Sequence, residues 1–208
     1  FESSGQISVV DNYVWAEAAG QIARWREKFG VTMPVSVNLS RVDVFDPKLE
    51  AQLEALVERY DLDHKSLKLE ITESAYTQDS AQIISTVKAL REAGFHIEID
   101  DFGSGYSSLN MLSSMPIDIL KMDRAFVQNI EHSDKDVQLV SLIIGIAENL
   151  GIPVVAEGVE TEAQYRAMEA KVDRQPSGRN VPLDVRGGTN HFSTVKAWTS
   201  GFYPGALW

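Results

Sequence analysis

Cysteine is absent from the chain, and histidine occurs only four times. Without thiols there can be no disulfide, no thiolate metal site and no cysteine nucleophile. The spacing of the four histidines is not typical of metal ligands, so we interpret them as structural or solvated. They are His64, His96, His132 and His191.

Positive charge is also scarce, because 19 Lys and Arg residues face 30 Asp and Glu residues and the formal net charge is −11. Binding to nucleic acid or to an anionic membrane surface needs clustered basic residues, so we expect no DNA or RNA partner. The net charge is still compatible with an anionic substrate that is bound through a metal ion, since a bound cation reverses the local field. The alternative is that the excess of acidic residues serves only to keep the protein soluble.

No uninterrupted apolar run is long enough for a membrane span, which needs about 18 residues or more. The sequence begins at Phe1 without a methionine or a signal-like region, so we expect a segment of a longer chain. We predict a cytoplasmic location. Apolar residues make up 44% of the chain, which is enough for a sizeable core.

Apolar residues at helical spacing alternate with short strand-like runs along the first 171 residues. One helical stripe contains Val10, Val14, Ala18, Ile22, Trp25 and Phe29, and Gly30 ends that helix. The strand-like runs are 34–39, 67–71, 97–101, 117–122 and 154–157. Such alternation predicts parallel βα units, in an open sheet or a (β/α) barrel. The glycine-rich first turn typical of open-sheet nucleotide folds is missing.

The alternation stops after residue 171. Residues 172–208 are rich in Gly and Pro and show no helical or strand period. We therefore predict a domain over residues 1–171. The remaining residues 172–208 are a divergent tail, either foreign to the domain or a loop-rich cap.

An oxygen ligand or a lysine lies at the end of each strand-like run or one residue before it. In a βα barrel these ends converge on the face where active sites are built. Carboxylate and amide oxygens suit hard divalent ions such as Mg²⁺ or Mn²⁺, and two such ions can bind a phosphodiester and activate water. The alternative is a set of strand-end residues in a barrel without catalysis. The residues are Asn38, Glu70, Asp100, Asp101, Lys121 and Glu157.

Two charged residues precede these strand ends by one strand period. Lys68 lies two residues before Glu70, and Glu98 lies two residues before Asp100. Both side chains should therefore point to the barrel interior, one layer below the ligands. Because a lone buried charge is costly, we predict a Lys68–Glu98 ion pair.

Five motifs in this order resemble the EAL family of cyclic di-GMP phosphodiesterases, over residues 1–171. Asp101-Phe102-Gly103 alone could suggest a protein kinase, but the glycine-rich phosphate loop and His-Arg-Asp catalytic loop are missing. The motifs are Val37-Asn38-Leu39-Ser40, Leu69-Glu70-Ile71-Thr72-Glu73-Ser74, Asp100-Asp101-Phe102-Gly103-Ser104-Gly105-Tyr106-Ser107-Ser108-Leu109, Leu120-Lys121-Met122-Asp123-Arg124 and Val155-Ala156-Glu157-Gly158-Val159-Glu160-Thr161.

The resemblance implies a TIM-like (β/α) barrel that opens cyclic di-GMP to linear pGpG with Mg²⁺ or Mn²⁺. It implies a first metal held by Asn38, Glu70 and Asp100. It implies a second held by Asp100, Asp101 and Glu157.

The resemblance also implies three residues that act in catalysis. Lys121 would contact the attacking water, and Glu157 would act beside the second metal. Glu73 would anchor the loop 102–108, which in the family governs metal binding and dimerisation. Glu160 is a weaker candidate, which can simply support the start of the next helix.

The sequence departs from the family pattern at both ends. It begins after the family's Glu-x-Leu strand, whose glutamate is a metal ligand, and no Val-Gln-Gly-Tyr strand follows residue 171. We therefore expect an incomplete TIM-like (β/α) barrel of the EAL type that is inactive or weakly active. Its exposed strand edges should favour a homodimer. The alternatives are a non-catalytic dinucleotide-binding or protein-interaction module, and a gene fragment without present function.

Overall fold

The computed structural model describes residues 7–77, 80–103, 109–172, 181–186 and 189–193. The chain divides into two compact units. The first contains Phe1–Ile99 and Ser108–Asp118, and the second contains Asp100–Ser107 and Ile119–Trp208.

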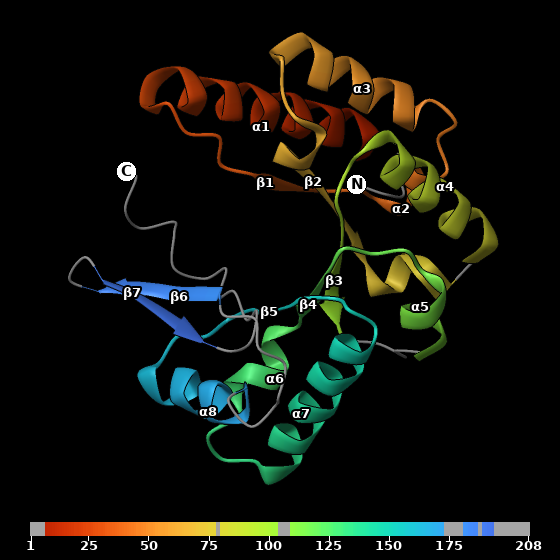
Figure 1. The fold of residues 1–208 in the computed structure, drawn as a ribbon. Coiled ribbons are helices and arrows are strands. Elements are labelled where there is room, and N and C mark those ends of the chain that lie inside the picture. The colour runs from red at the N-terminus through yellow and green to blue at the C-terminus, as the bar shows by residue number, and fades with distance from the viewer. Residues whose placement is uncertain (1–6, 78–79, 104–108, 173–180, 187–188, 194–208) are drawn as a thin grey trace. The chain divides into compact units, whose positions relative to one another are not determined.

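Helices and strands alternate from the first described residue (Figure 1). The helical elements are α1 (Ile7–Phe29), α2 (Arg41–Val44), α3 (Leu49–Tyr60), η2 (His64–Ser66), η3 (Glu73–Thr77), α4 (Ser80–Ala93), α5 (Leu109–Ser114), α6 (Arg124–Gln128), α7 (Asp134–Asn149) and α8 (Glu162–Val172). The strands are β1 (Val35–Asn38), β2 (Leu67–Thr72), β3 (Ile97–Phe102), β4 (Ile119–Met122), β5 (Val154–Ala156), β6 (Val181–Arg186) and β7 (Thr189–Ser193).

Five strands form one sheet in the order β1-β2-β3-β4-β5, which is also their order along the chain. The pairs β1–β2 and β4–β5 are parallel. Sequential parallel strands with helical crossovers are the pattern of a (β/α) barrel, here incomplete. The predicted fold class is therefore confirmed.

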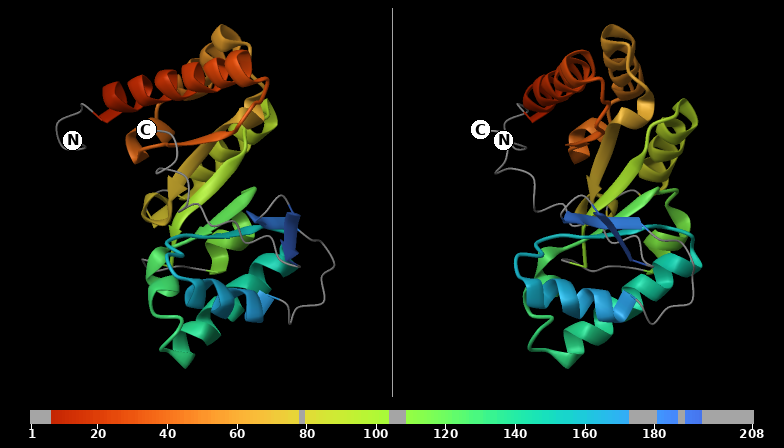
Figure 2. Two further views of the ribbon diagram at one scale, coloured as in Figure 1. Left: turned by 90° about the vertical axis from the view of Figure 1, so that its left-hand side faces the viewer. Right: turned by 60° about the vertical axis from the view of Figure 1, so that its left-hand side comes forward.

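Helices α1 and α3 lie side by side in the first unit, as Figures 1 and 2 show from three directions. Trp15 and Ile22 of α1 and Leu53 of α3 are fully buried. The predicted apolar stripe of α1 was partly wrong, because Val10 and Val14 are each 45% exposed. Two neighbouring stripes of this helix are apolar, and tertiary packing selected the one with the bulky Trp15.

The inner strands of the first unit follow the predicted period of two. Leu67, Leu69, Ile97 and Ile99 are fully buried. Alternate residues of the same strands therefore point to the opposite face of the sheet. This alternation positions the strand-end polar side chains described below.

In the second unit, α7 buries Val140, Ile144 and Ala147, which share one helical face. The helix is followed by Gly151, whose φ of 71° is a left-handed conformation that glycine adopts without strain. The chain then enters β5.

Strands β6 and β7 form an antiparallel hairpin within residues 172–208. The register shifts between Pro182 and Asp184, which marks a β-bulge or irregularity. The sequence shows no strand period there, so this hairpin was not predicted. Pairing with a neighbouring strand can order a segment whose own pattern is irregular. Residues 173–180, 187–188 and 194–208 of the predicted tail lie outside the described residues.

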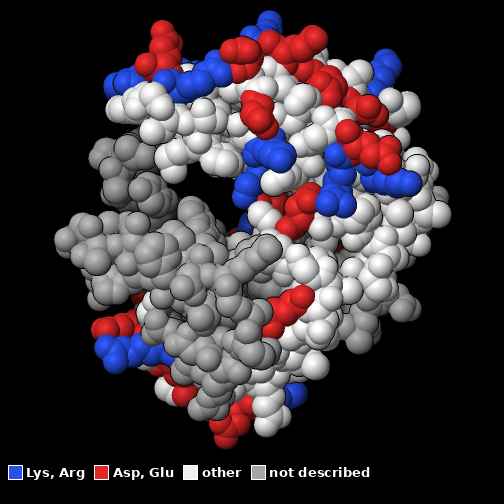
Figure 3. Space-filling view, in the orientation of Figure 1, with Lys and Arg blue, Asp and Glu red and all other residues white. Residues whose placement is uncertain are grey.

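Among the described residues, no helix combines the length and apolarity needed to cross a membrane. Figure 3 shows Lys and Arg side chains interspersed with Asp and Glu side chains on the described part of one face.

Candidate active site

The ends of β1 and β2 place Asn38 beside Glu70 in the first unit. The two residues are register partners in the parallel pair, and the Leu39 amide donates a hydrogen bond of 2.8 Å to the Glu70 carbonyl. Glu70 is buried, whereas Asn38 is exposed. Two oxygen-bearing side chains are thus held at neighbouring strand ends.

Trp15 fixes the end of β1 from the side of α1. Its indole Nε1 donates a hydrogen bond of 2.9 Å to the Asn38 carbonyl, and its side chain is fully buried. A buried indole needs such an acceptor, so the bond stabilises both groups. This role was not predicted from the sequence, because helical spacing alone does not say which tryptophan reaches a strand 23 residues away.

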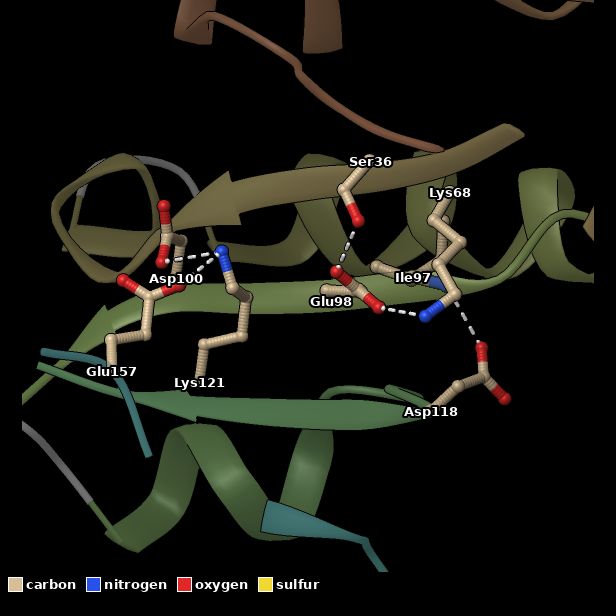
Figure 4. Close-up of polar contacts among 8 residues, drawn as sticks. All are labelled: Ser36, Lys68, Ile97, Glu98, Asp100, Asp118, Lys121 and Glu157. Atoms are coloured by element: carbon tan, nitrogen blue, oxygen red, sulfur yellow. Dashed lines mark hydrogen bonds and ion pairs between the residues drawn. The ribbon is translucent and has the colours of Figure 1, made fainter. Parts of the chain in front are cut away.

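In the second unit, Lys121 forms ion pairs with two of the predicted carboxylate ligands (Figure 4). Its Nζ is 3.3 Å from Asp100 Oδ1 and 2.7 Å from Glu157 Oε1. The three residues come from β3, β4 and the residue after β5. The Glu157 amide donates a hydrogen bond of 3.2 Å to the Met122 carbonyl, which holds Glu157 at the end of β4.

Asp101 adds a carboxylate in an unusual backbone conformation. Its φ is 53°, and its amide donates a hydrogen bond of 3.0 Å to Asp100 Oδ1. Burial raises the pKa of the Asp101 carboxyl, and the negative charges of Asp100, Asp123 and Glu157 raise it further. Left-handed residues other than glycine are sparse and cluster at functional sites. The repulsion between Asp101 and these neighbouring carboxylates indicates a site that a bound cation would stabilise.

Asp123 is a further acidic residue of this site that was not predicted from the sequence. It precedes α6, and its Oδ1 accepts a hydrogen bond of 2.6 Å from the Ala125 amide. The position two residues after Lys121 on the same segment was an available signal, because period two puts both on one face.

Glu73, predicted to anchor the loop 102–108, is the first residue of η3 and is 3% exposed. Residues 104–108 of that loop lie outside the described residues. Gly103, which opens the loop, has a φ of 94°, and a Cβ there would collide with the Phe126 ring of α6. Glycine is therefore required at this position.

The residue types fit a divalent cation better than any other cofactor. Carboxylate and amide oxygens are the ligands of Mg²⁺ and Mn²⁺. The repulsion around Asp101 gives these oxygens a reason to bind a cation. Over the described ranges, however, no three His, Cys, Asp or Glu side chains converge as a metal-binding group. The Lys121 ammonium is the cation that contacts Asp100 and Glu157 in this structure.

The predicted Lys68–Glu98 ion pair is confirmed in the first unit (Figure 4). Lys68 Nζ is 2.8 Å from Glu98 Oε1. The Glu98 side chain is 4% exposed and that of Lys68 is 24% exposed, so water reaches only the lysine to a substantial extent.

Residues 1–173 match the EAL domain family, and the chain belongs to this family. The incomplete (β/α) barrel is therefore of the EAL type, as predicted. The strand-end carboxylates, Lys121 and the Glu73 motif lie within the matched residues.

Among curated relatives, the chain is 32% identical to the cyclic di-GMP phosphodiesterase PdeR of Escherichia coli over 160 residues. That match covers 77% of this chain and 24% of PdeR. The chain is 36% identical to MucR of Pseudomonas aeruginosa, a bifunctional diguanylate cyclase and cyclic di-GMP phosphodiesterase, over 163 residues. This match covers 78% of this chain and 24% of MucR. The chain thus spans about a quarter of these relatives.

Solved structures of the family have the same fold. The PaMucR phosphodiesterase in complex with c-di-GMP superimposes with a TM-score of 0.76 at 34% identity, covering 82% of this chain and 69% of that chain. The EAL domain of Mycobacterium smegmatis DcpA gives a TM-score of 0.72 at 34% identity, covering 76% of this chain and 72% of that chain.

Proposed function

We propose that this chain carries the phosphodiester-cleaving site of a cyclic di-GMP phosphodiesterase. The observation that carries the proposal is the contact of Lys121 with Asp100 and Glu157, which joins the ends of three strands. The family match and the names of the relatives support the substrate. Its domain lies in residues 1–171, in keeping with a family match that ends at residue 173.

The site would hold Mg²⁺ or Mn²⁺ through the strand-end oxygens. A first ion would use Asn38, Glu70 and Asp100. A second would use Asp100, Asp101 and Glu157. Such ions, when bound, supply positive charge to the phosphodiester oxygens.

Lys121 has two tasks in this proposal. Its ammonium offsets the charge of Asp100 and Glu157, which hold it in place by the two ion pairs. The same ammonium orients the attacking water and stabilises negative charge that develops on the phosphate. Glu73 would anchor the loop 102–108, whose residues 104–108 lie outside the described residues.

Two measurements test the proposal on the full chain. Titration calorimetry with Mn²⁺ should give binding for the wild type and weaker binding for Asp100→Asn. Asp61→Asn is the matched control, because the Asp61 side chain is 97% exposed. Equal heats for wild type and Asp100→Asn would show that the metal site does not exist.

Chromatography of cyclic di-GMP incubated with the chain and excess Mn²⁺ gives the activity. Formation of linear pGpG at a rate within the ordinary range of enzymes is the result expected from a phosphodiester-cleaving site. Binding of cyclic di-GMP without any hydrolysis would favour the non-catalytic dinucleotide-binding module instead.

A further inference from the structure

Three polar side chains lie one strand period before predicted ligand positions. Ser36 precedes Asn38 by two residues, Lys68 precedes Glu70, and Glu98 precedes Asp100. Ser36 and Lys68 are register partners, as are Asn38 and Glu70. Because side chains alternate along a strand, Ser36 and Lys68 share the face of Asn38 and Glu70.

Glu98 binds both of its neighbours in this layer (Figure 4). Its Oε1 is 2.8 Å from Lys68 Nζ, and its Oε2 accepts a hydrogen bond of 2.9 Å from Ser36 Oγ. Among the described residues, each carboxylate oxygen of Glu98 thus has one donor, and the two donors belong to different strands. Since Glu98 is 3% exposed, these donors replace the water that its charge has lost.

The Ser36 bond gives β1 an attachment in addition to its ladder with β2 and the Trp15 bond. Strand β1 has four residues and is the first strand in the order of the five-stranded sheet, next to β2. A bond from Ser36 to Glu98 passes over β2 and ties β1 directly to β3. Without the Ser36 bond, this short edge strand would depend on its few ladder bonds with β2 and on the Trp15 bond.

Strand β3 is itself anchored at its start. The Ile97 amide donates a hydrogen bond of 2.9 Å to Asp118 Oδ2, and Arg91 makes two hydrogen bonds to the Asp118 carboxylate. Glu98 follows Ile97 directly, so it offers β1 a fixed point of attachment.

We propose that Ser36, Lys68 and Glu98 form a three-strand clamp that orders the ends of β1 and β2, where Asn38 and Glu70 lie. Its members are positioning residues, because they act through the strands. Their effect on metal binding rests on the proposed function, whereas the ordering of the strand ends does not.

Ser36 offers the sharpest test, because it is exposed and can be enlarged without a clash in the core. Ser36→Thr keeps the hydroxyl, and Ser36→Val has the same shape without it. Thr and Val are both β-branched and favour strands, so a difference between the two variants reports the loss of the hydrogen bond alone. Thermal unfolding of both variants checks that the fold is retained.

Hydrogen exchange of the Leu39 amide, which donates to the Glu70 carbonyl, reports order at the strand ends. We expect about fivefold faster exchange in Ser36→Val than in Ser36→Thr, from the loss of one hydrogen bond. Calorimetry with Mn²⁺ should give about tenfold weaker binding for Ser36→Val, with wild-type affinity restored in Ser36→Thr.

Equal exchange in the two variants would overturn the clamp. Different exchange with equal Mn²⁺ affinity would overturn its positioning role. If the wild type binds no Mn²⁺, the proposed metal site fails, and the exchange comparison still decides whether the clamp orders the strand ends.

Discussion

Asp11 of α1 faces a second carboxylate, that of Asp43 in α2. Asp11 Oδ2 is buried without a hydrogen-bond partner, and Asp43 is 2% exposed. Asp43 Oδ2 accepts a hydrogen bond of 2.9 Å from the Ser40 amide. Burial raises the pKa of Asp11 to about 6, and Asp43 raises it further through a shared hydrogen bond and charge repulsion, while the Ser40 hydroxyl lowers it. A proton on Asp11 therefore gives the pair its missing donor.

This shift predicts a pH-dependent stability. The pKa of Asp11 is higher in the folded chain than its ordinary value of 3.8. The contribution of Asp11 to the stability of the fold is therefore fully present below pH 3.8 and is lost as the pH rises through about 6. Asp11→Asn should therefore stabilise the fold at pH 7.5, by on the order of 1 kcal/mol after solvent screening. The gain should vanish at pH 4.

Thermal unfolding at pH 4 and pH 7.5 measures this difference. Asp61→Asn serves as the control, since the Asp61 side chain is 97% exposed and its ion pair with Arg26 is a surface contact, so its effect should differ little between the two pH values. A gain from Asp11→Asn that is the same at both pH values would show that Asp11 does not carry the shift.

Gly158 and Gly151 share a left-handed backbone conformation but differ in whether an added side chain would also collide with a neighbour. Gly158 and Gly151 both have a φ of 71°, but a Cβ at Gly158 would lie 2.6 Å from the Cβ of Arg124, whereas a Cβ at Gly151 meets nothing within 4 Å. Gly151→Ala should cost about 1–2 kcal/mol of unfolding free energy. Gly158→Ala should cost more, because α6 must also shift.

Urea unfolding of both variants gives the two free energies. Equal losses would mean that the chain after Glu157 is not packed against Arg124. Since Gly158 directly follows Glu157, we also expect Gly158→Ala, but not Gly151→Ala, to weaken Mn²⁺ binding.

At the scale of the strands, the Lys68–Glu98 ion pair joins β2 to β3. Substitution of its two members is the strongest test of the predicted polar contacts one layer below the ligand positions. Lys68→Met and Glu98→Leu should each destabilise the fold by roughly 1–3 kcal/mol, because each leaves one charge without its partner. The double variant should lose less than the sum of the two, with a coupling of about 0.5–3 kcal/mol.

The surface pair Lys88–Glu92 is the matched control, because it is exposed and its atoms are 3.8 Å apart. Helical pairs of this kind couple by only about 0.2–0.5 kcal/mol. Additive losses for Lys68→Met and Glu98→Leu in chemical unfolding would mean that the two residues do not interact.

Helix α1 shows that a periodic pattern predicts the bounds of a helix but not which of its faces is buried. The bounds of α1 agree with the predicted stripe and with Gly30, whose amide donates a hydrogen bond of 2.9 Å to the Arg26 carbonyl. The buried face differs, because Trp15 rather than Val14 packs into the core. Local spacing defines a helix, but which side is buried depends on the elements that cover it.

At the scale of the whole molecule, we predict a homodimer. Strands β1 and β5 end the order of the five-stranded sheet, and edge strands carry backbone groups that can pair with another chain. Multi-angle light scattering across a concentration series should give twice the mass of 23.1 kDa. A monomer at the highest concentration would contradict this prediction.

The sequence by itself determined the order of the five strands, the polar residues at or near their ends and the Lys68–Glu98 pair. These follow from a period of two and from the residue types, which are properties of neighbouring positions. Only the tertiary structure decided that Trp15 holds Asn38, that Ser36 reaches Glu98 and that residues 181–193 contain a hairpin. Ser36 and Glu98 are 62 residues apart in the chain. Such partners meet only when several elements pack together, so no local pattern identifies them.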